Sequence, residues 1–106
     1  MPSIFTKIIN REIPANILYE DDKVIAIYDI QPVQEGHFLV IPKIQKTDIL
    51  ELSEEEYTYL LLKARELAKK YVQENNCDGF QVQINTGEAA GQTVFHTHVH
   101  VIPYKK

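Results

Sequence analysis

One segment near the middle of the chain, residues 53–75, constrains the fold most. Ser53 is followed three residues later by Glu56, which is the capping-box spacing that begins a helix. Apolar side chains then recur at helical spacing, which predicts one long amphipathic helix that ends near Asn75 and Asn76. A helix with a single apolar face buries that face against a second layer of structure, so we expect the fold to contain such a layer.

The segments on either side of this helix predict a sheet. We expect strands at residues 17–20, 24–29, 36–42, 79–85 and 96–103, and a short helix over residues 4–9. The third strand is almost continuously apolar, which predicts a central strand that is buried on both faces. The order of elements predicts a single α+β domain over residues 1–106, with a five-stranded, mainly antiparallel sheet.

Composition excludes several classes of function. A chain of 106 residues with 44% hydrophobic and 25% charged residues is expected to form one globular domain. Its formal net charge of −4 argues against binding to duplex nucleic acid, which requires a basic face. No segment approaches the roughly 20 apolar residues that cross a bilayer, and the one cysteine, Cys77, cannot form an intrachain disulfide. We therefore expect a soluble cytoplasmic protein with no membrane or nucleic-acid partner.

Three of the four histidines lie in the last expected strand, which reads HTHVHVIP. Because side chains alternate between the faces of a strand, His96, His98 and His100 are expected on the face toward a ligand, about 6–7 Å apart. The valines between and after them are expected in the core. Such a set could bind zinc with an open coordination position. Alternatively, one imidazole could be a nucleophile whose neighbours set its tautomer or donate protons.

The surrounding sequence weighs against a metal without deciding the matter. The loop TGEAAGQT at residues 86–93 offers only Glu88 as an acidic ligand. Gly87 and Gly91 permit tight turns and a close approach of the backbone to a ligand, and the polar residues after them add donors. The loop could therefore hold a phosphate, and a plain surface loop is the alternative.

Three separated segments resemble the histidine triad nucleotide-binding family, and most of all its Hint branch; they read IFTKIINREIPANILYEDD, YDIQPVQEGHFLVIPK and GQTVFHTHVHVIP. The last segment matches the motif His-φ-His-φ-His-φ-φ, where φ is apolar, and Thr97 is its one weak fit. The resemblance implies a homodimer in which two sheets join into a continuous ten-stranded sheet. It also implies binding of a purine nucleotide and hydrolysis of nucleoside 5′-phosphoramidates at the α-phosphate, through a nucleotidyl-histidine and without a cofactor.

The resemblance also implies a role for each matched residue. His98 would be the nucleophile, His100 would contact the phosphate and His96 would support the triad. His37 would be an additional histidine of the site, and Asp29 would hold the ribose hydroxyls, a role that suits a carboxylate accepting two hydrogen bonds. The other matched positions are Ile27 and Ile30 for the base, and Asn85, Gly91, Gln92 and Thr93 for the phosphate loop.

This sequence departs from its resemblance to the family at two places. Thr93 stands where relatives have a serine that contacts the phosphate or the leaving group. Many bacterial relatives hold a structural zinc with two N-terminal cysteines, a histidine after the IPK segment and the first triad histidine. Ser3 and Thr6 occupy the cysteine positions here, and Gln45 or a neighbour replaces the histidine, so we expect no metal.

Other functions stay open at this point. A dinucleoside polyphosphate hydrolase of the same family would differ from a phosphoramidase in its substrates. A non-catalytic nucleotide-binding or interaction module would bind a nucleotide without forming an adduct, and a zinc hydrolase would lose its activity to a chelator.

Overall fold

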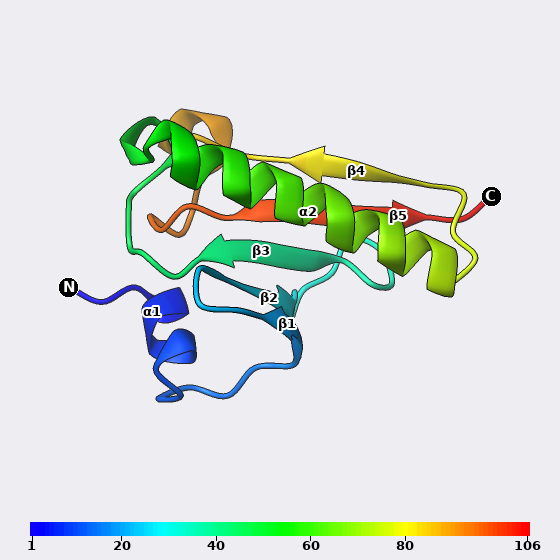
Figure 1. Ribbon diagram of the computed structural model, residues 1–106, viewed down its shortest axis with the longest axis horizontal. Coiled ribbons are helices and arrows are strands. Elements are labelled where there is room, and N and C mark those ends of the chain that lie inside the picture. Colours follow the sequence, from blue (N-terminus) through cyan, green and yellow to red (C-terminus); the bar gives the residue numbers. More distant parts are fainter.

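The sheet is built around its third strand in chain order. In the computed structural model, which describes residues 1–106, five antiparallel strands form one sheet in the order β1-β2-β3-β5-β4 (Figure 1). The elements are α1 (Ile4–Ile9), β1 (Ile17–Glu20), β2 (Val24–Tyr28), β3 (Phe38–Pro42), η1 (Ile49–Glu51), α2 (Glu54–Glu74), β4 (Gly79–Gln83), η2 (Glu88–Ala90) and β5 (Val99–Tyr104). All five residues of β3 are buried in the middle of the sheet, which confirms the predicted central strand and the α+β class.

The two helices pack on opposite faces of the sheet. The long helix α2 lies across one face (Figure 1), where its buried residues contact alternate residues of β2, β3 and β5. On the other face, Phe5 and Ile8 of α1 pack against Ile25, Leu39 and Ile41. Because α1 has only six residues, it covers only part of that face. The uncovered part is where a ligand can approach the strands.

Local signals place α2 as the sequence predicts. The Ser53 hydroxyl accepts a hydrogen bond from the Glu56 N–H at 3.1 Å, and the Glu56 carboxylate accepts one from the Ser53 N–H at 2.7 Å. This capping box satisfies donors that the first turn would otherwise leave free. Asn75 caps the other end. Neither helix is both long enough and apolar enough to cross a membrane.

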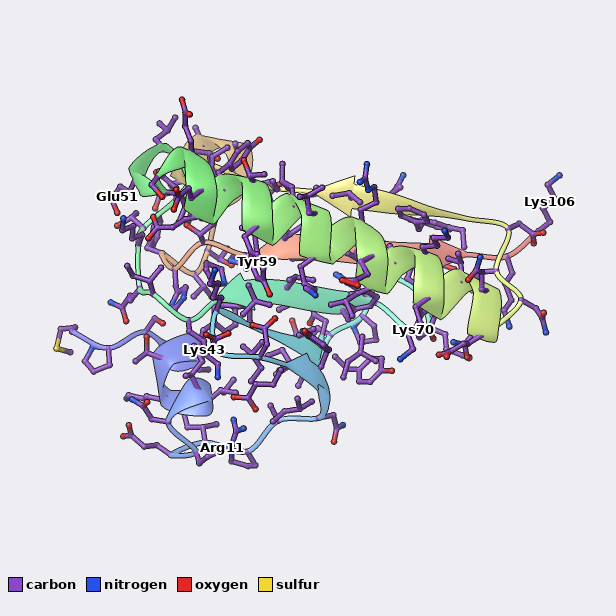
Figure 2. The ribbon with its side chains drawn as sticks, viewed as in Figure 1. Arg11, Lys43, Glu51, Tyr59, Lys70 and Lys106 are labelled. Atoms are coloured by element: carbon purple, nitrogen blue, oxygen red, sulfur yellow. The ribbon has the colours of Figure 1, made fainter.

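A half-buried carboxylate ties the first hairpin to α2. Asp21, in the turn between β1 and β2, accepts hydrogen bonds from the Tyr19 hydroxyl at 2.8 Å and the Tyr59 hydroxyl at 2.5 Å. Tyr59 is labelled on α2 in Figure 2. Burial alone would raise the pKa of Asp21, but the hydrogen bonds from Tyr59 and from the turn backbone lower it below its usual range. The carboxylate is therefore charged, and it holds the turn under the helix.

Four expected strands differ from the observed ones in their bounds, and the strands expected at residues 24–29 and 36–42 span only Val24–Tyr28 and Phe38–Pro42. The strand expected at residues 96–103 begins only at Val99, because the N–H of Thr97 donates to the Lys46 carbonyl at 2.8 Å instead of joining the ladder with β3. The strand expected at residues 79–85 ends at Gln83 and is mostly exposed instead of half-buried. Its position at the edge of the sheet explains this exposure.

A close contact at Gly36 fixes the chain just before β3. Gly36 has a φ of +87°, and a Cβ at this position would lie 2.1 Å from the Tyr71 hydroxyl oxygen on α2. Only glycine adopts this conformation without strain and leaves room for the tyrosine. The contact positions the next residue, His37, at the end of the sheet.

We expect Gly36→Ala to lower the free energy of unfolding by about 2–4 kcal/mol, because it adds backbone strain to an overpacked contact. Urea unfolding monitored by circular dichroism measures this loss. Gly79→Ala is the matched control, since no atom lies within 4 Å of a Cβ at Gly79. Equal stability of the two variants would contradict the assigned constraint.

Candidate active site

The register of the sheet places three site residues in one row. Ile27 on β2 is opposite Leu39 on β3, and Leu39 is opposite His100 on β5. Directly opposed residues share a face of a sheet, and this is the face that carries α1. Leu39 therefore lies between two predicted site residues. The sequence did not mark Leu39, because an apolar residue in a buried strand carries no separate functional signal.

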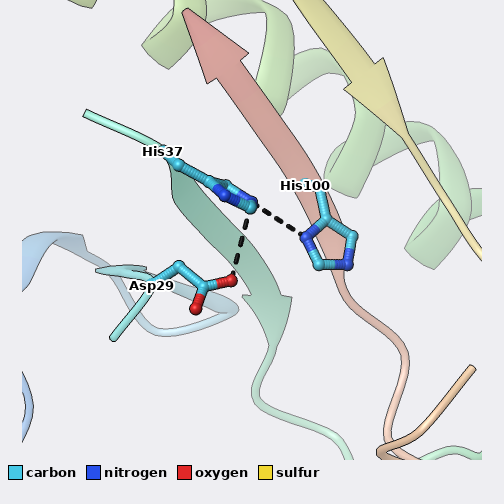
Figure 3. A group of neighbouring side chains, drawn as sticks. All are labelled: Asp29, His37 and His100. Atoms are coloured by element: carbon cyan, nitrogen blue, oxygen red, sulfur yellow. Dashed lines mark hydrogen bonds and ion pairs between the residues drawn. The ribbon is translucent and has the colours of Figure 1, made fainter. Parts of the chain in front are cut away.

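His37 precedes Leu39 by two residues and Asp29 follows Ile27 by two, and both side chains converge with His100 beside this row (Figure 3). His37 Nε2 lies 3.0 Å from His100 Nδ1 and 3.6 Å from a carboxylate oxygen of Asp29. The backbone N–H of Val33 donates to His37 Nδ1 at 3.1 Å. A neutral imidazole has one proton, so the proton of His37 is on Nε2 and points to His100 Nδ1. His100 consequently carries its own proton on Nε2.

The same three side chains have ligand atoms within 4.8 Å of one another, a spacing that could hold a metal ion. Metal binding needs a lone pair on each ligand nitrogen. His37 Nε2 has none while the Val33 N–H occupies Nδ1, so a metal would have to displace that backbone contact. The proton arrangement therefore favours a hydrogen-bond relay over a metal site.

In His98 the protonated ring nitrogen is Nδ1, whereas in His37 and His100 it is Nε2. Its Nδ1 lies 2.8 Å from the His96 carbonyl oxygen, which can only accept, so Nδ1 carries the proton. Nε2 is left with a free lone pair, and the side chain is 9% exposed. Phe5 of α1 contacts the ring edge-on at 5.0 Å between centroids, and the His100 ring lies at the same distance. The His98 ring, which has a lone pair on Nε2, therefore lies next to the His100 ring, which carries an N–H.

His96 is more deeply buried than the other two triad histidines. It is fully buried, its Nε2 donates to the Pro42 carbonyl at 2.8 Å, and its Nδ1 lies 2.6 Å from the Ser3 hydroxyl. The expectation that all three triad histidines face a ligand is therefore wrong for His96. Phe5 of α1 contacts both the His96 ring and the His98 ring, so His96 lies on the expected side of the chain but is covered by the N-terminal segment.

All four histidines are held neutral. Burial lowers the pKa of His37, His96 and His98 below the usual value of 6.5. Burial also lowers the pKa of His100, to about 4, with a smaller contribution from the two neighbouring imidazoles. Neutral rings are required both for the lone pair of His98 and for the single protons of the relay.

The glycine-containing loop is braced from inside by Gln92. The Gln92 side chain is buried; its Oε1 accepts from the Gly87 N–H at 2.8 Å, and its Nε2 donates to the carbonyls of Thr47 and Val94 at 2.7 and 3.1 Å. Every polar atom of the side chain thus has a partner in the protein. Gln92 therefore shapes the predicted phosphate loop, and the next residue, Thr93, is exposed.

The remaining predicted residues lie around these groups. Asp29 directs one carboxylate oxygen toward His37, and its other oxygen accepts from the Gln31 N–H at 2.9 Å. Ile27 is buried and Ile30 is 92% exposed. In the loop, Asn85 Nδ2 lies 3.5 Å from the Gly91 carbonyl oxygen.

Comparison with known proteins shows which family this chain belongs to. The HIT domain model matches residues 10–106. A 13.1 kDa HIT-like protein of Mesomycoplasma hyorhinis is 50% identical over 103 residues, covering 97% of this chain and 93% of that protein. The adenylylsulfatase HINT1 of Arabidopsis thaliana is 42% identical over 107 residues, covering 95% of this chain and 70% of that protein.

Solved structures agree with these relationships. A HIT-like protein from Bartonella henselae superposes with a TM-score of 0.94 at 38% identity, covering 98% of this chain and 79% of that one. A zinc-bound histidine triad protein from Mycobacterium smegmatis has a TM-score of 0.94 at 35% identity, with coverage of 98% and 76%. This chain therefore belongs to the HIT family, whose members bind nucleotides and include hydrolases.

The depressed pKa of His100 predicts a loss of stability in acid. Between pH 6.5 and about 4 the unfolded chain binds a proton that the folded chain excludes, so the free energy of unfolding falls as the pH drops through this window. Urea unfolding at several pH values should show this fall, and His100→Asn should reduce it. An NMR titration that finds a midpoint near 6.5 for the His100 ring would contradict the assignment.

Proposed function

We propose that this chain hydrolyses nucleoside 5′-phosphoramidates at the α-phosphorus, with His98 as the nucleophile. The observation that carries the proposal is the pairing of an unprotonated Nε2 on His98 with an N–H on His100, their ring centroids 5.0 Å apart. One ring can attack an electrophile while the other donates a hydrogen bond to its developing charge. A phosphoryl group bound next to both rings would be attacked by His98 and would accept a hydrogen bond from His100.

In the first step, His98 Nε2 attacks the α-phosphorus and the bond from phosphorus to the amine nitrogen breaks. The amine takes a proton from solvent as it leaves, and the nucleotide is bonded to His98; the proton that water loses in the second step returns to solvent. In the second step, water attacks the same phosphorus, the bond to Nε2 breaks and the nucleoside monophosphate is released. His100 and Thr93 would donate to the phosphoryl oxygens, since phosphoryl transfer depends chiefly on positioning and charge stabilisation.

The groups around the histidines suit a nucleotide. The Asp29 carboxylate can accept hydrogen bonds from two ribose hydroxyls. Ile27 and the exposed Ile30 offer apolar surface to a purine base. The braced loop from Gly87 to Gln92 would support the phosphate from the other side.

A second candidate substrate is adenylyl sulfate. The relative HINT1 from Arabidopsis thaliana is named an adenylylsulfatase. The attack on phosphorus would be the same, with sulfate leaving in place of an amine. Dinucleoside polyphosphates are a third possibility, with a nucleotide as the leaving group, so the leaving group is what a substrate panel must resolve.

We expect His98→Ala to reduce release of AMP from an adenosine phosphoramidate to background, because no covalent intermediate can form. Folding and AMP binding should be retained, as circular dichroism and calorimetry would show. The assay is run on EDTA-treated protein, with Cys77→Ser as a control outside the site. Turnover by His98→Ala equal to that of wild type would exclude His98 as the nucleophile.

We also propose that two copies join along β4 into one continuous ten-stranded sheet. β4 is an edge strand whose outer N–H and C=O groups have no partner strand within the chain. Phe80 and Val82 on this strand are 39% and 46% exposed. Unpaired edges with apolar residues favour pairing with another chain.

Replacing both Phe80 and Val82 with lysine should shift the protein from dimer to monomer, since it places like charges along the shared edge. Sedimentation equilibrium measures the change. Ile17→Lys is the matched control, because Ile17 is 41% exposed on β1, the opposite edge strand. A wild-type monomer, or a dimer that survives the double substitution, would exclude this interface.

A further inference from the structure

A chain of hydrogen bonds joins the N-terminal helix to the triad. Ser3 is the N-cap of α1, and its hydroxyl lies 2.6 Å from His96 Nδ1. The Thr6 hydroxyl donates to Gln45 Oε1 at 2.6 Å, and the same oxygen accepts from the Ser3 N–H at 2.7 Å. Residues far apart in the sequence therefore meet at one side of the buried His96 ring.

These groups do not fit a metal. Structural zinc prefers thiolates and imidazoles, whereas Ser3, Thr6 and Gln45 present two neutral hydroxyls and an amide oxygen. The Thr6 and Gln45 oxygens are already joined to each other at 2.6 Å. Hydrogen bonds join these side chains to one another and to His96.

The direction of the bond between Ser3 and His96 follows from its neighbours. His96 Nε2 faces the Pro42 carbonyl, which can only accept, so the single proton of the neutral ring is on Nε2. Nδ1 then has only a lone pair, and the Ser3 hydroxyl must donate to it. The same hydroxyl oxygen accepts from the Thr6 N–H at 3.0 Å, which completes the helix cap.

We propose that Ser3 is a positioning residue for the nucleophile: its hydroxyl holds His96 in place, and the His96 carbonyl in turn fixes the proton of His98 on Nδ1. This inference rests on the proposed function of His98. If the single proton of the His96 ring moved to Nδ1, Nε2 would present a lone pair to the Pro42 carbonyl oxygen, and the ring and its backbone would have to shift. The carbonyl that receives the His98 proton at 2.8 Å belongs to that same residue.

A second contact from the same helix supports this inference. Phe5 lies two residues after Ser3 and packs edge-on against both rings, at 5.7 Å from His96 and 5.0 Å from His98. A shift of α1 would therefore move both imidazoles. Ser3 contacts His96 where the helix begins, and Phe5 contacts His96 and His98 from the first turn. The position of α1 therefore fixes the positions of both rings.

The competing explanation is that Ser3 only caps the helix. Three variants separate the two roles. Ser3→Thr keeps both the cap and the hydroxyl proton. Ser3→Asp keeps a capping oxygen but has no proton to donate, so it should place a proton on Nδ1 of His96. Ser3→Ala removes both functions.

Long-range ¹H–¹⁵N spectra of the imidazoles test the inference without any substrate. Wild type and Ser3→Thr should show His96 protonated at Nε2 and His98 at Nδ1. Ser3→Asp should show His96 protonated at Nδ1 and an altered His98 signal, although its helix is capped and its thermal midpoint is close to that of wild type. Unchanged His96 and His98 signals in folded Ser3→Asp would overturn the proposal and leave Ser3 as a cap only.

Kinetics test the link to the nucleophile. We expect kcat to fall about 10- to 100-fold in Ser3→Asp with little change in KM, as when a partner that orients a histidine is lost, and to recover in Ser3→Thr. Unchanged kcat beside altered imidazole signals would overturn the link from Ser3 to His98. Absence of turnover in wild type, with the imidazole changes still present, would overturn the proposed function while supporting the hold of Ser3 on the rings.

Discussion

Backbone groups that bind one ring nitrogen of His37, His96 and His98 are the constraint on which the site depends. The Val33 N–H donates to Nδ1 of His37. The His96 carbonyl accepts from Nδ1 of His98, and the Pro42 carbonyl accepts from Nε2 of His96. Backbone donors and acceptors cannot exchange roles, so each contact decides where the ring proton lies. With burial keeping every ring neutral, His98 is left with a lone pair and His100 with an N–H.

The fold serves this arrangement by bringing distant backbone segments together. β3 and β5 are neighbours in the middle of the sheet although they are far apart in the chain. α2 covers one face, and its Tyr71 presses on Gly36 at the turn that leads into His37. α1 covers part of the other face and holds the triad through Ser3 and Phe5. The carbonyls of Lys46 and Thr47 anchor the segment before β5 and the braced loop.

Local signals in the sequence predicted most of the fold, and contacts between distant residues explain what was not predicted. The capping box at Ser53 and the apolar run of β3 depend on neighbouring residues, and both were found where expected. The start of β5 depends on the bond between Thr97 and Lys46, so the strand was expected three residues too early, and the full burial of His96 was not expected. Residue types and spacing identified the histidines as candidates. Their tautomers depend on which backbone N–H or C=O group meets each ring, and the spacing of the histidines does not reveal this.

The most direct test of the account is to trap the covalent intermediate. The protein is mixed with an adenosine phosphoramidate and quenched in alkali, which preserves phosphorus–nitrogen bonds, and its peptides are mapped by mass spectrometry. The account predicts an adenylyl group on the peptide that contains residues 96–100, located on His98 by fragmentation. An adenylyl group on His100 or His37, or steady turnover with no adduct under any quench, would contradict it.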